Sequence, residues 1–314
     1  MNQNIIFGGV LPLLELNAFL PQEINLTLWK RILEEFRSLG GYLLRFHADN
    51  ITRCRDIQRL TAVADRLDLS PCTAINGVRS GYSPLDPDIL SQTNLYCVSV
   101  MTDGKLICQD DYLSNIRSIL VTKTKIELYL KVTQKSLSDL EPVAQFCAAY
   151  GIPACIVDIE RFPDDVSQKL RGREYYETVK LCSEITQRYA GKVRMSVADC
   201  PYLCTEGNLN MRGGCTAGII SCAVDENAML FPCAHMNRLA VGDLNQQSLG
   251  DLWNNSEIFV RLRNRSTFSG SCGVCAFREK CGGCRAESYA AHGDYFGSDP
   301  MCWLSDELSV PGKE

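Results

Sequence analysis

Four cysteines stand close together in the C-terminal third of the chain. They are Cys272, Cys275, Cys281 and Cys284, and their spacing is C-x2-C-x5-C-x2-C. A segment this short cannot bury a core of its own, so four thiols at this spacing indicate a bound metal. Thiolates in such a pattern select zinc or an iron–sulfur cluster. Gly282 and Gly283 let the backbone approach the sulfur atoms and point amides at them, which suits an anionic cluster.

The number of cysteines nearby distinguishes these two metals. One tetrahedral zinc ion could use all four thiols of the run. Three further cysteines, Cys215, Cys233 and Cys302, remain in the same region. Seven or eight thiols are what two four-iron clusters need, and in two-cluster ferredoxins the last cysteine of a dense run binds the other cluster. We therefore expect two iron–sulfur clusters, with Cys284 bound apart from its neighbours.

The cysteines are unevenly distributed along the 314 residues. Ten of the 17 lie between Cys200 and Cys302, and seven come earlier: Cys54, Cys72, Cys97, Cys108, Cys147, Cys155 and Cys182. The early ones are too scattered for a chelating loop, and we expect ordinary buried or surface thiols there. This asymmetry predicts two domains, residues 1–198 and residues 199–314.

Composition excludes several classes of function. A net charge of −5 provides no basic face for phosphates, so we expect no nucleic-acid partner. No apolar stretch is long enough to cross a bilayer, and no secretory signal is recognisable, so we expect no membrane association. Many cysteines without a secretory signal favour the reducing cytoplasm.

The elements that must position these residues alternate along the N-terminal domain. Apolar runs predict strands over Val10–Leu16, Tyr42–Phe46, Cys72–Ile75, Leu95–Val100, Ile126–Val132 and Ala154–Ile159. Amphipathic segments predict helices over Leu28–Leu39, Ile57–Leu67 and Leu137–Tyr150, and one more over Leu249–Leu262. The fold class is α/β. Six such units can bend into a partial (β/α)6 barrel of the TIM type, although a flat doubly wound sheet obeys the same local rules.

The C-terminal domain closely resembles the SPASM domain, the C-terminal module of many radical SAM enzymes that modify peptides and of related haem-pathway enzymes. The matching residues are Gly214-Cys215-Thr216-Ala217-Gly218, Phe231-Pro232-Cys233, Gly242-Asp243-Leu244, Trp253, the four-cysteine run, Arg285-Ala286, Gly293-Asp294 and Asp299-Pro300-Met301-Cys302. Two positions depart from the family. Ala228 stands where a glycine is usual, and two residues rather than three separate Cys281 from Cys284.

The resemblance implies two auxiliary [4Fe–4S] clusters in a small irregular α+β domain. The first would be bound by Cys272, Cys275, Cys281 and Cys302. The second would be bound by Cys215, Cys233, Cys284 and a fourth ligand, Cys204, with Cys200 or Cys222 as alternatives.

The N-terminal domain is similar in outline to the radical SAM partial barrel. The resemblance lies in Leu39-Gly40, Ile75-Asn76-Gly77, and Val98-Ser99-Val100 with Asp103-Gly104. The family's C-x3-C-x2-C loop, whose cluster binds SAM, is missing: Leu14–Pro21 stands at its expected place, and the first cysteine is Cys54. His47-Ala48-Asp49-Asn50 replaces the Gly-Gly-Glu-Pro segment that holds the SAM amine. The chain thus resembles a degenerate member of the family, for which we expect no bound SAM and no catalytic residues.

Three functions are compatible with these features. The leading hypothesis is a pseudoenzyme that acts as accessory partner of a radical SAM enzyme in peptide or cofactor maturation, by binding the peptide substrate or passing electrons. The second is an enzyme in its own right that uses an auxiliary cluster with an open iron site. The third is a structural zinc protein with a binding barrel, which does not account for Cys215, Cys233 and Cys302.

Overall fold

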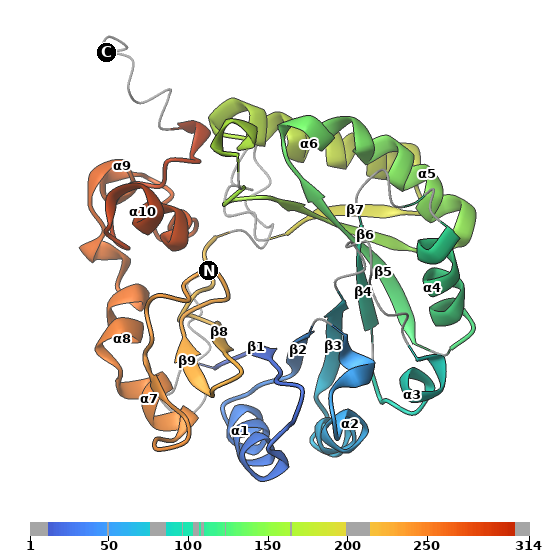
Figure 1. Cartoon of the computed structure of the whole chain (residues 1–314). Helices are drawn as coiled ribbons and strands as arrows, with labels where there is room; N and C mark the ends of the chain where they lie inside the picture. The colour runs from blue at the N-terminus through green and yellow to red at the C-terminus, as the bar shows by residue number, and fades with distance from the viewer. Residues whose placement is uncertain are drawn as a thin grey trace. The chain divides into compact units, whose positions relative to one another are not determined.

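The computed structural model describes residues 12–48, 50–75, 86–95, 97–102, 107, 110–122, 124–163, 165–198 and 214–304. They form two compact units, whose helices and strands are labelled in Figure 1. The first unit consists of the described parts of residues 1–101, 108–126 and 216–263, and the second of the described parts of residues 102–107, 127–215 and 264–314. Each of these units combines segments from both sides of the expected boundary between residues 198 and 199. That boundary was inferred from the distribution of cysteines along the sequence, and it stays a prediction.

The first unit contains a mostly parallel sheet. Its described strands are β1 (Glu15–Phe19), β2 (Leu43–Ala48), β3 (Ser70–Ile75), β4 (Cys97–Thr102), β8 (Ser221–Val224), β9 (Met229–Phe231) and β10 (Gly242–Asp243). They lie in the order β10-β9-β8-β1-β2-β3-β4, parallel from β8 to β4 and antiparallel from β8 to β10. The short strands of the C-terminal part therefore extend the sheet that the N-terminal strands begin.

Helices cover one side of this sheet. They are α1 (Leu26–Ser38), α2 (Ile57–Arg66), α3 (Pro87–Ser91), α4 (Asp110–Leu120), α7 (Leu249–Asn255) and α8 (Glu257–Arg263), with a 3-10 turn at Ile51–Arg53. The Asn25 side chain accepts a hydrogen bond from the Leu28 amide at 3.2 Å and so begins α1. Leu16 of β1 and Phe46 of β2 are completely buried, because alternate strand residues point to the helical side.

The second unit combines three parallel strands with a loop-rich segment. The strands are β5 (Lys125–Val132), β6 (Ala154–Ile159) and β7 (Arg194–Val197), in that order. The helices are α5 (Leu140–Tyr150), α6 (Gly172–Arg188), α9 (Gly270–Val274) and α10 (Arg285–His292), with 3-10 turns at Gln134–Asp139, Val166–Gln168 and Arg265–Thr267. Gly151 ends α5 in the left-handed conformation, which glycine adopts without strain.

The expected α/β class with parallel strands is confirmed, while some boundaries differ. The first strand is Glu15–Phe19 rather than Val10–Leu16, because the alternation of buried and polar residues continues to Phe19. The helix expected over residues 249–262 is two helices, because the backbone of Ser256 is extended and α8 restarts after it. The described strands β7 to β10 were not expected. They are two to four residues long, too short for a periodic signal.

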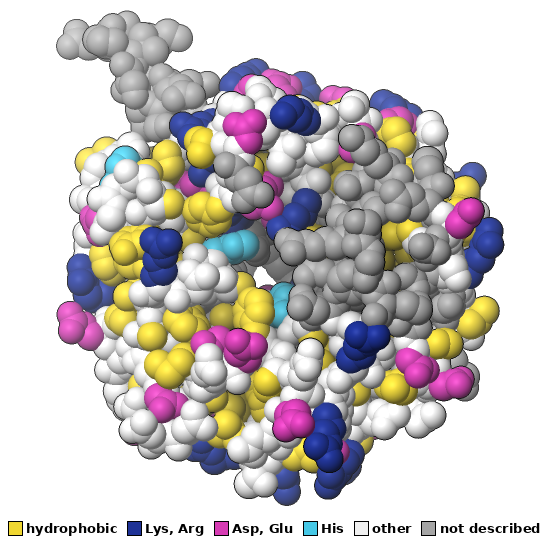
Figure 2. Space-filling model, viewed as in Figure 1, with side chains coloured by type: hydrophobic (Ala, Val, Ile, Leu, Met, Phe, Trp, Pro, Cys, Tyr) yellow, Lys and Arg dark blue, Asp and Glu magenta, His cyan; other side chains and the backbone are white. Residues whose placement is uncertain are grey.

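Two surface properties bear on possible partners. None of the described helices is both long and apolar enough to cross a bilayer. On the face seen in Figure 2, basic and acidic side chains of the described residues are interspersed. This mixture agrees with the net charge of −5.

Candidate metal centre

Six of the expected cluster ligands lie in the second unit. They are Cys215, Cys272, Cys275, Cys281, Cys284 and Cys302, and each is partly exposed. The short helix α9 carries Cys272 and ends at Val274, directly before Cys275, and α10 begins directly after Cys284. The Cys215 amide donates to the Cys281 carbonyl at 2.8 Å, which joins the segment before β8 to the four-cysteine run.

Backbone amides point at three of these sulfur atoms. Donor and acceptor are 3.4 Å apart from Phe277 N to Cys275 Sγ, and equally from Gly283 N to Cys281 Sγ. The Asp299 amide lies 3.4 Å from Cys272 Sγ. Amide donors lower the cost of holding sulfur as thiolate, which is the form that binds metal.

A buried arginine also contacts this set of thiols. Arg285 is 1% exposed, and its Nη2 lies 3.4 Å from Cys272 Sγ. Its Nη1 donates to the carbonyls of Tyr295 and Gly297, at 3.1 and 2.9 Å. The guanidinium lies 4.5 Å from the centre of the Phe268 ring. The described ion pairs include none with Arg285, and its Nε has no hydrogen-bond partner.

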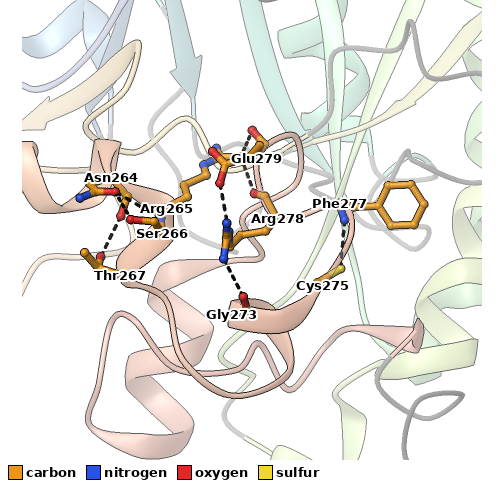
Figure 3. A network of polar contacts seen from close by, with 9 residues as sticks. All are labelled: Asn264, Arg265, Ser266, Thr267, Gly273, Cys275, Phe277, Arg278 and Glu279. Atoms are coloured by element: carbon orange, nitrogen blue, oxygen red, sulfur yellow. Dashed lines mark hydrogen bonds and ion pairs between the residues drawn. The ribbon is translucent and has the colours of Figure 1, made fainter.

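A second buried arginine holds the loop that leads to Cys281 (Figure 3). Arg265 is 8% exposed and donates to the carbonyls of Arg278 and Glu279 through Nη1, at 3.2 and 2.9 Å. Its Nη2 donates to the Cys215 carbonyl at 2.8 Å. Burial lowers the pKa of Arg265, whereas negative charge on Cys215 and Cys281 raises it. Thiolates at Cys215 and Cys281 would therefore stabilise the charged form of this buried arginine.

The outer side of the same loop is fixed by a half-exposed arginine. Arg278 donates to the Gly273 carbonyl at 2.8 Å and to the Glu279 carboxylate at 3.0 Å (Figure 3). These bonds connect α9 to the residues between Cys275 and Cys281. Arg278 has a carboxylate partner, which distinguishes it from the two buried arginines.

Two adjacent glycines fit against the buried guanidinium groups. Gly282 and Gly283 have φ values of +70° and +58°, which L side chains rarely adopt. A Cβ at Gly282 would lie 2.8 Å from Cζ of Arg265. A Cβ at Gly283 would lie 2.6 Å from Nη2 of Arg285 and 3.1 Å from Cys272 Sγ. Both positions therefore require glycine for space as well as for conformation.

Cys284 has a different environment from the other thiols of the run. Its amide donates to the carboxylate of Asp299, which is 1% exposed. Burial raises the pKa of the Cys284 thiol to about 12, although the positive charge of Arg161 opposes the shift. A thiolate at this position needs a bound cation to stabilise it.

These features fit an anionic cluster held by thiolates. In the described part of the chain, no three His, Cys, Asp or Glu side chains lie close enough to hold one metal ion. A four-iron cluster instead takes one thiolate at each corner. Two buried guanidinium groups and amides directed at sulfur suit the charge of such a group.

The remaining candidate ligands lie elsewhere. Cys233 is in the first unit, after β9, and is partly exposed. Cys222 is in β8, completely buried and in register with Leu16, and burial raises the pKa of its thiol far above the ordinary value. Cys200 and Cys204 lie outside the described residues.

The described cysteines of the N-terminal part are core residues, as expected. Cys54, Cys72, Cys97, Cys147, Cys155 and Cys182 are all buried, while Cys108 lies outside the described residues. A hydrogen bond to Cys147, together with burial, raises the pKa of Cys155. Such thiols are unreactive and add to packing.

The loop after the first strand is short and contains no cysteine. Because β1 ends at Phe19 and α1 begins at Leu26, this loop consists of residues 20–25. Most of Leu14–Pro21, the segment expected to stand in the loop, is β1 itself. Six residues are fewer than the eight that C-x3-C-x2-C would occupy.

His47, at the end of β2, is a hydrogen-bonded histidine. Its Nε2 lies 2.9 Å from Asn17 Oδ1, and its ring stacks on Phe19 with centroids 4.6 Å apart. Burial, with the charges of Arg45 and His235, lowers the pKa of His47 to about 4. Asp49, with Asn76, Gly77, Asp103 and Gly104 of the expected motifs, lies outside the described residues.

Arg265, Arg285 and Asp299 have no predicted role from the sequence alone. The signal that was available is the position of Arg285, which directly follows the last cysteine of a dense run. A basic residue there predicts an anion nearby. Arg265 carries no such signal, because it lies sixteen residues before Cys281 and reaches that loop only in the folded chain.

Comparison with known proteins identifies the C-terminal module. The SPASM family, described as an iron–sulfur cluster-binding domain, matches residues 215–285. An AdoMet-dependent heme synthase of Methanosarcina barkeri is 39% identical over 110 residues, which is 35% of this chain and 30% of that protein. A PqqA peptide cyclase of Methylobacterium sp. is 22% identical over 90% of this chain and 79% of that protein.

A solved structure has the same fold over most of the chain. SuiB of Streptococcus suis, in the crystal structure bound to the precursor peptide SuiA, aligns with a TM-score of 0.71 at 15% identity. The alignment covers 92% of this chain and 75% of SuiB. This likeness shows the fold, while the cysteine pattern and the family match identify residues 215–285 as a SPASM iron–sulfur module of the kind found in radical SAM/SPASM proteins.

Proposed function

We propose that this protein binds two [4Fe–4S] clusters and acts as a non-catalytic partner of a radical SAM enzyme in the maturation of a peptide or cofactor. The observation that carries the proposal is the loop of residues 20–25, which is short and has no cysteine. A radical SAM enzyme needs three thiolates there. A protein that retains the SPASM cysteines without that loop can bind a peptide or pass electrons, but has no site for SAM.

The proposed ligands divide into two sets. Cys272, Cys275, Cys281 and Cys302 bind the first cluster, and amide donors directed at three of these sulfur atoms support this set. The second cluster takes Cys215, Cys233, Cys284 and Cys204. Cys200 is the alternative fourth ligand, and Cys222 is disfavoured because it is a core residue of β8.

The peptide substrate is suggested by the relatives. PqqA peptide cyclase is named for a peptide, and SuiB was crystallised with the peptide SuiA. The partner enzyme follows from the missing loop, since an enzyme that cleaves SAM must then come from outside. We place the protein in the reducing cytoplasm, in keeping with the 17 cysteines of the sequence.

The first experiment is anaerobic purification with determination of iron, sulfide and zinc. We expect a brown protein with roughly eight irons and eight sulfides per chain. With SAM and dithionite, it should form neither methionine nor 5′-deoxyadenosine, although the same assay with a radical SAM enzyme does. A colourless protein that contains only zinc would disprove the cluster assignment, and cleavage of SAM would disprove the non-catalytic role.

A second function is an enzyme that uses an open iron site on the second cluster. The structure describes Cys215, Cys233 and Cys284 but not Cys200 or Cys204, so the fourth ligand is the question. Replacing Cys200, Cys204 and Cys222 by alanine one at a time distinguishes the two functions. Loss of four irons in one variant supports a fully ligated cluster, and no loss in any of the three supports the open site.

A further inference from the structure

We infer that Arg285, assisted by Arg265, balances the charge of the first cluster and raises its reduction potential. This inference rests on the proposed function, because it requires a cluster on Cys272, Cys275, Cys281 and Cys302. It assigns a role to two side chains that are not ligands.

The environment of Arg285 is unusual for an arginine. A buried guanidinium is normally paired with a carboxylate, because leaving an ion unpaired in the interior is costly. Here its partners are two carbonyl oxygens, the Phe268 ring and the sulfur of Cys272. The sulfur is the only one of these that becomes an anion. The charge of Arg285 is therefore satisfied when Cys272 is a thiolate bound to a cluster.

Arg265 adds a second buried cation on the other side of the glycine pair. Gly282 lies against Arg265 and Gly283 against Arg285, so adjacent residues of one loop contact one guanidinium each. Arg265 reaches the ligand Cys215 through its carbonyl rather than its sulfur. Two like charges so close repel each other, and an anionic group beside both of them removes this penalty.

The expected effect on the cluster follows from charge. In a titration with dithionite the bound cluster accepts one electron, no bond is made or broken, and the negative charge of the site increases by one. A cation and an N–H donor at Cys272 Sγ stabilise the reduced state more than the oxidised state, and so raise the potential. Removing them should make reduction harder.

The test is an anaerobic redox titration of the holoprotein followed by EPR. Arg285→Gln removes the positive charge. Arg285→Lys keeps the charge but replaces the planar guanidinium, with its several N–H donors, by a single ammonium group. Arg278→Gln is the matched control, because Arg278 lies in the same segment but bonds a carbonyl and a carboxylate. We expect Arg285→Gln to lower the midpoint potential of the first cluster by at least about 59 mV, which is a tenfold decrease in the equilibrium constant for one-electron reduction. Arg285→Lys and Arg265→Gln should give smaller shifts in the same direction.

Iron and sulfide counts separate failure of this inference from failure of the proposed function. If the unmodified protein binds no cluster, the proposed function is wrong. If Arg285→Gln retains its clusters and its midpoint potential is unchanged, or if Arg278→Gln shifts the potential equally, the role of Arg285 is wrong. If Arg285→Gln folds by circular dichroism yet loses four irons, while Arg285→Lys and Arg278→Gln keep them, the charge balance is supported directly. If Arg285→Lys loses the same four irons although it keeps the charge, the role of Arg285 as charge partner is wrong.

Discussion

Arg285 donates a hydrogen bond to the sulfur of Cys272, with Nη2 and Sγ 3.4 Å apart. The two residues are thirteen positions apart in the sequence and belong to α10 and α9. The bond exists because Gly283, between them, leaves the space that the guanidinium fills. Cys272, Arg285 and Gly283 thus form one packed group in the second unit.

Cys302 lies outside the dense run, and its replacement tests the first ligand set. Cys302→Ala should reduce the iron content from roughly eight to roughly four per chain, because one cluster loses a corner. Iron and sulfide analysis of anaerobically purified protein measures this. Cys182→Ala, which replaces a buried thiol of α6, is the control and should keep all the iron. Equal iron in both variants would remove Cys302 from the ligand set.

Gly283 should not tolerate a side chain. Gly283→Ala places a Cβ 2.6 Å from Arg285 Nη2 at a φ of +58°, and should destabilise the second unit by about 1–3 kcal/mol. The urea midpoint of anaerobic holoprotein measures the change. Gly250→Ala in α7 is the control, since nothing lies within 4 Å of its Cβ, and it should stabilise the protein by about 0.5–1 kcal/mol. If Gly283→Ala leaves the urea midpoint unchanged, the side chain of Arg285 has room to move.

Ala228 adopts a backbone conformation that suits glycine. Its φ is +65°, in the turn between β8 and β9, where the Asp225 carboxylate accepts from the amides of Asn227 and Met229. Ala228→Gly should therefore raise stability by about 1 kcal/mol, because it relieves the left-handed strain. Thermal unfolding measures the gain. Ala223→Gly, in strand β8, should have the opposite sign, and a loss of stability in both variants would contradict the argument.

His47 should make the stability of the first unit depend on pH. Its pKa is lowered from 6.5 to about 4, so the folded state favours the neutral ring. The stability from this site is complete above pH 6.5 and is lost as the pH falls from 6.5 towards 4, by up to about 3 kcal/mol. Urea midpoints across this range test it. His47→Gln should flatten the dependence, while the exposed control His292→Gln should leave it as in the unmodified protein.

The sequence alone was sufficient for the α/β class, the iron–sulfur module and the absence of a C-x3-C-x2-C motif. Each of these depends on short-range information. Periodicity predicts an element such as Ala154–Ile159, and closely spaced cysteines such as Cys272 and Cys275 need no folding argument to be recognised as ligands. The helix end at Gly151 is likewise a local matter of backbone conformation.

What only the tertiary structure decided is the environment of those ligands. The partners of Arg265 include Cys215, which lies fifty positions earlier, and no local pattern connects them. The extension of β1 to Phe19 likewise follows the alternation of buried and partly exposed side chains rather than apolar character alone. The physical reason is the same in both cases: burial and charge pairing are set by segments distant in sequence, whereas motif spacing and helix ends are set by neighbours.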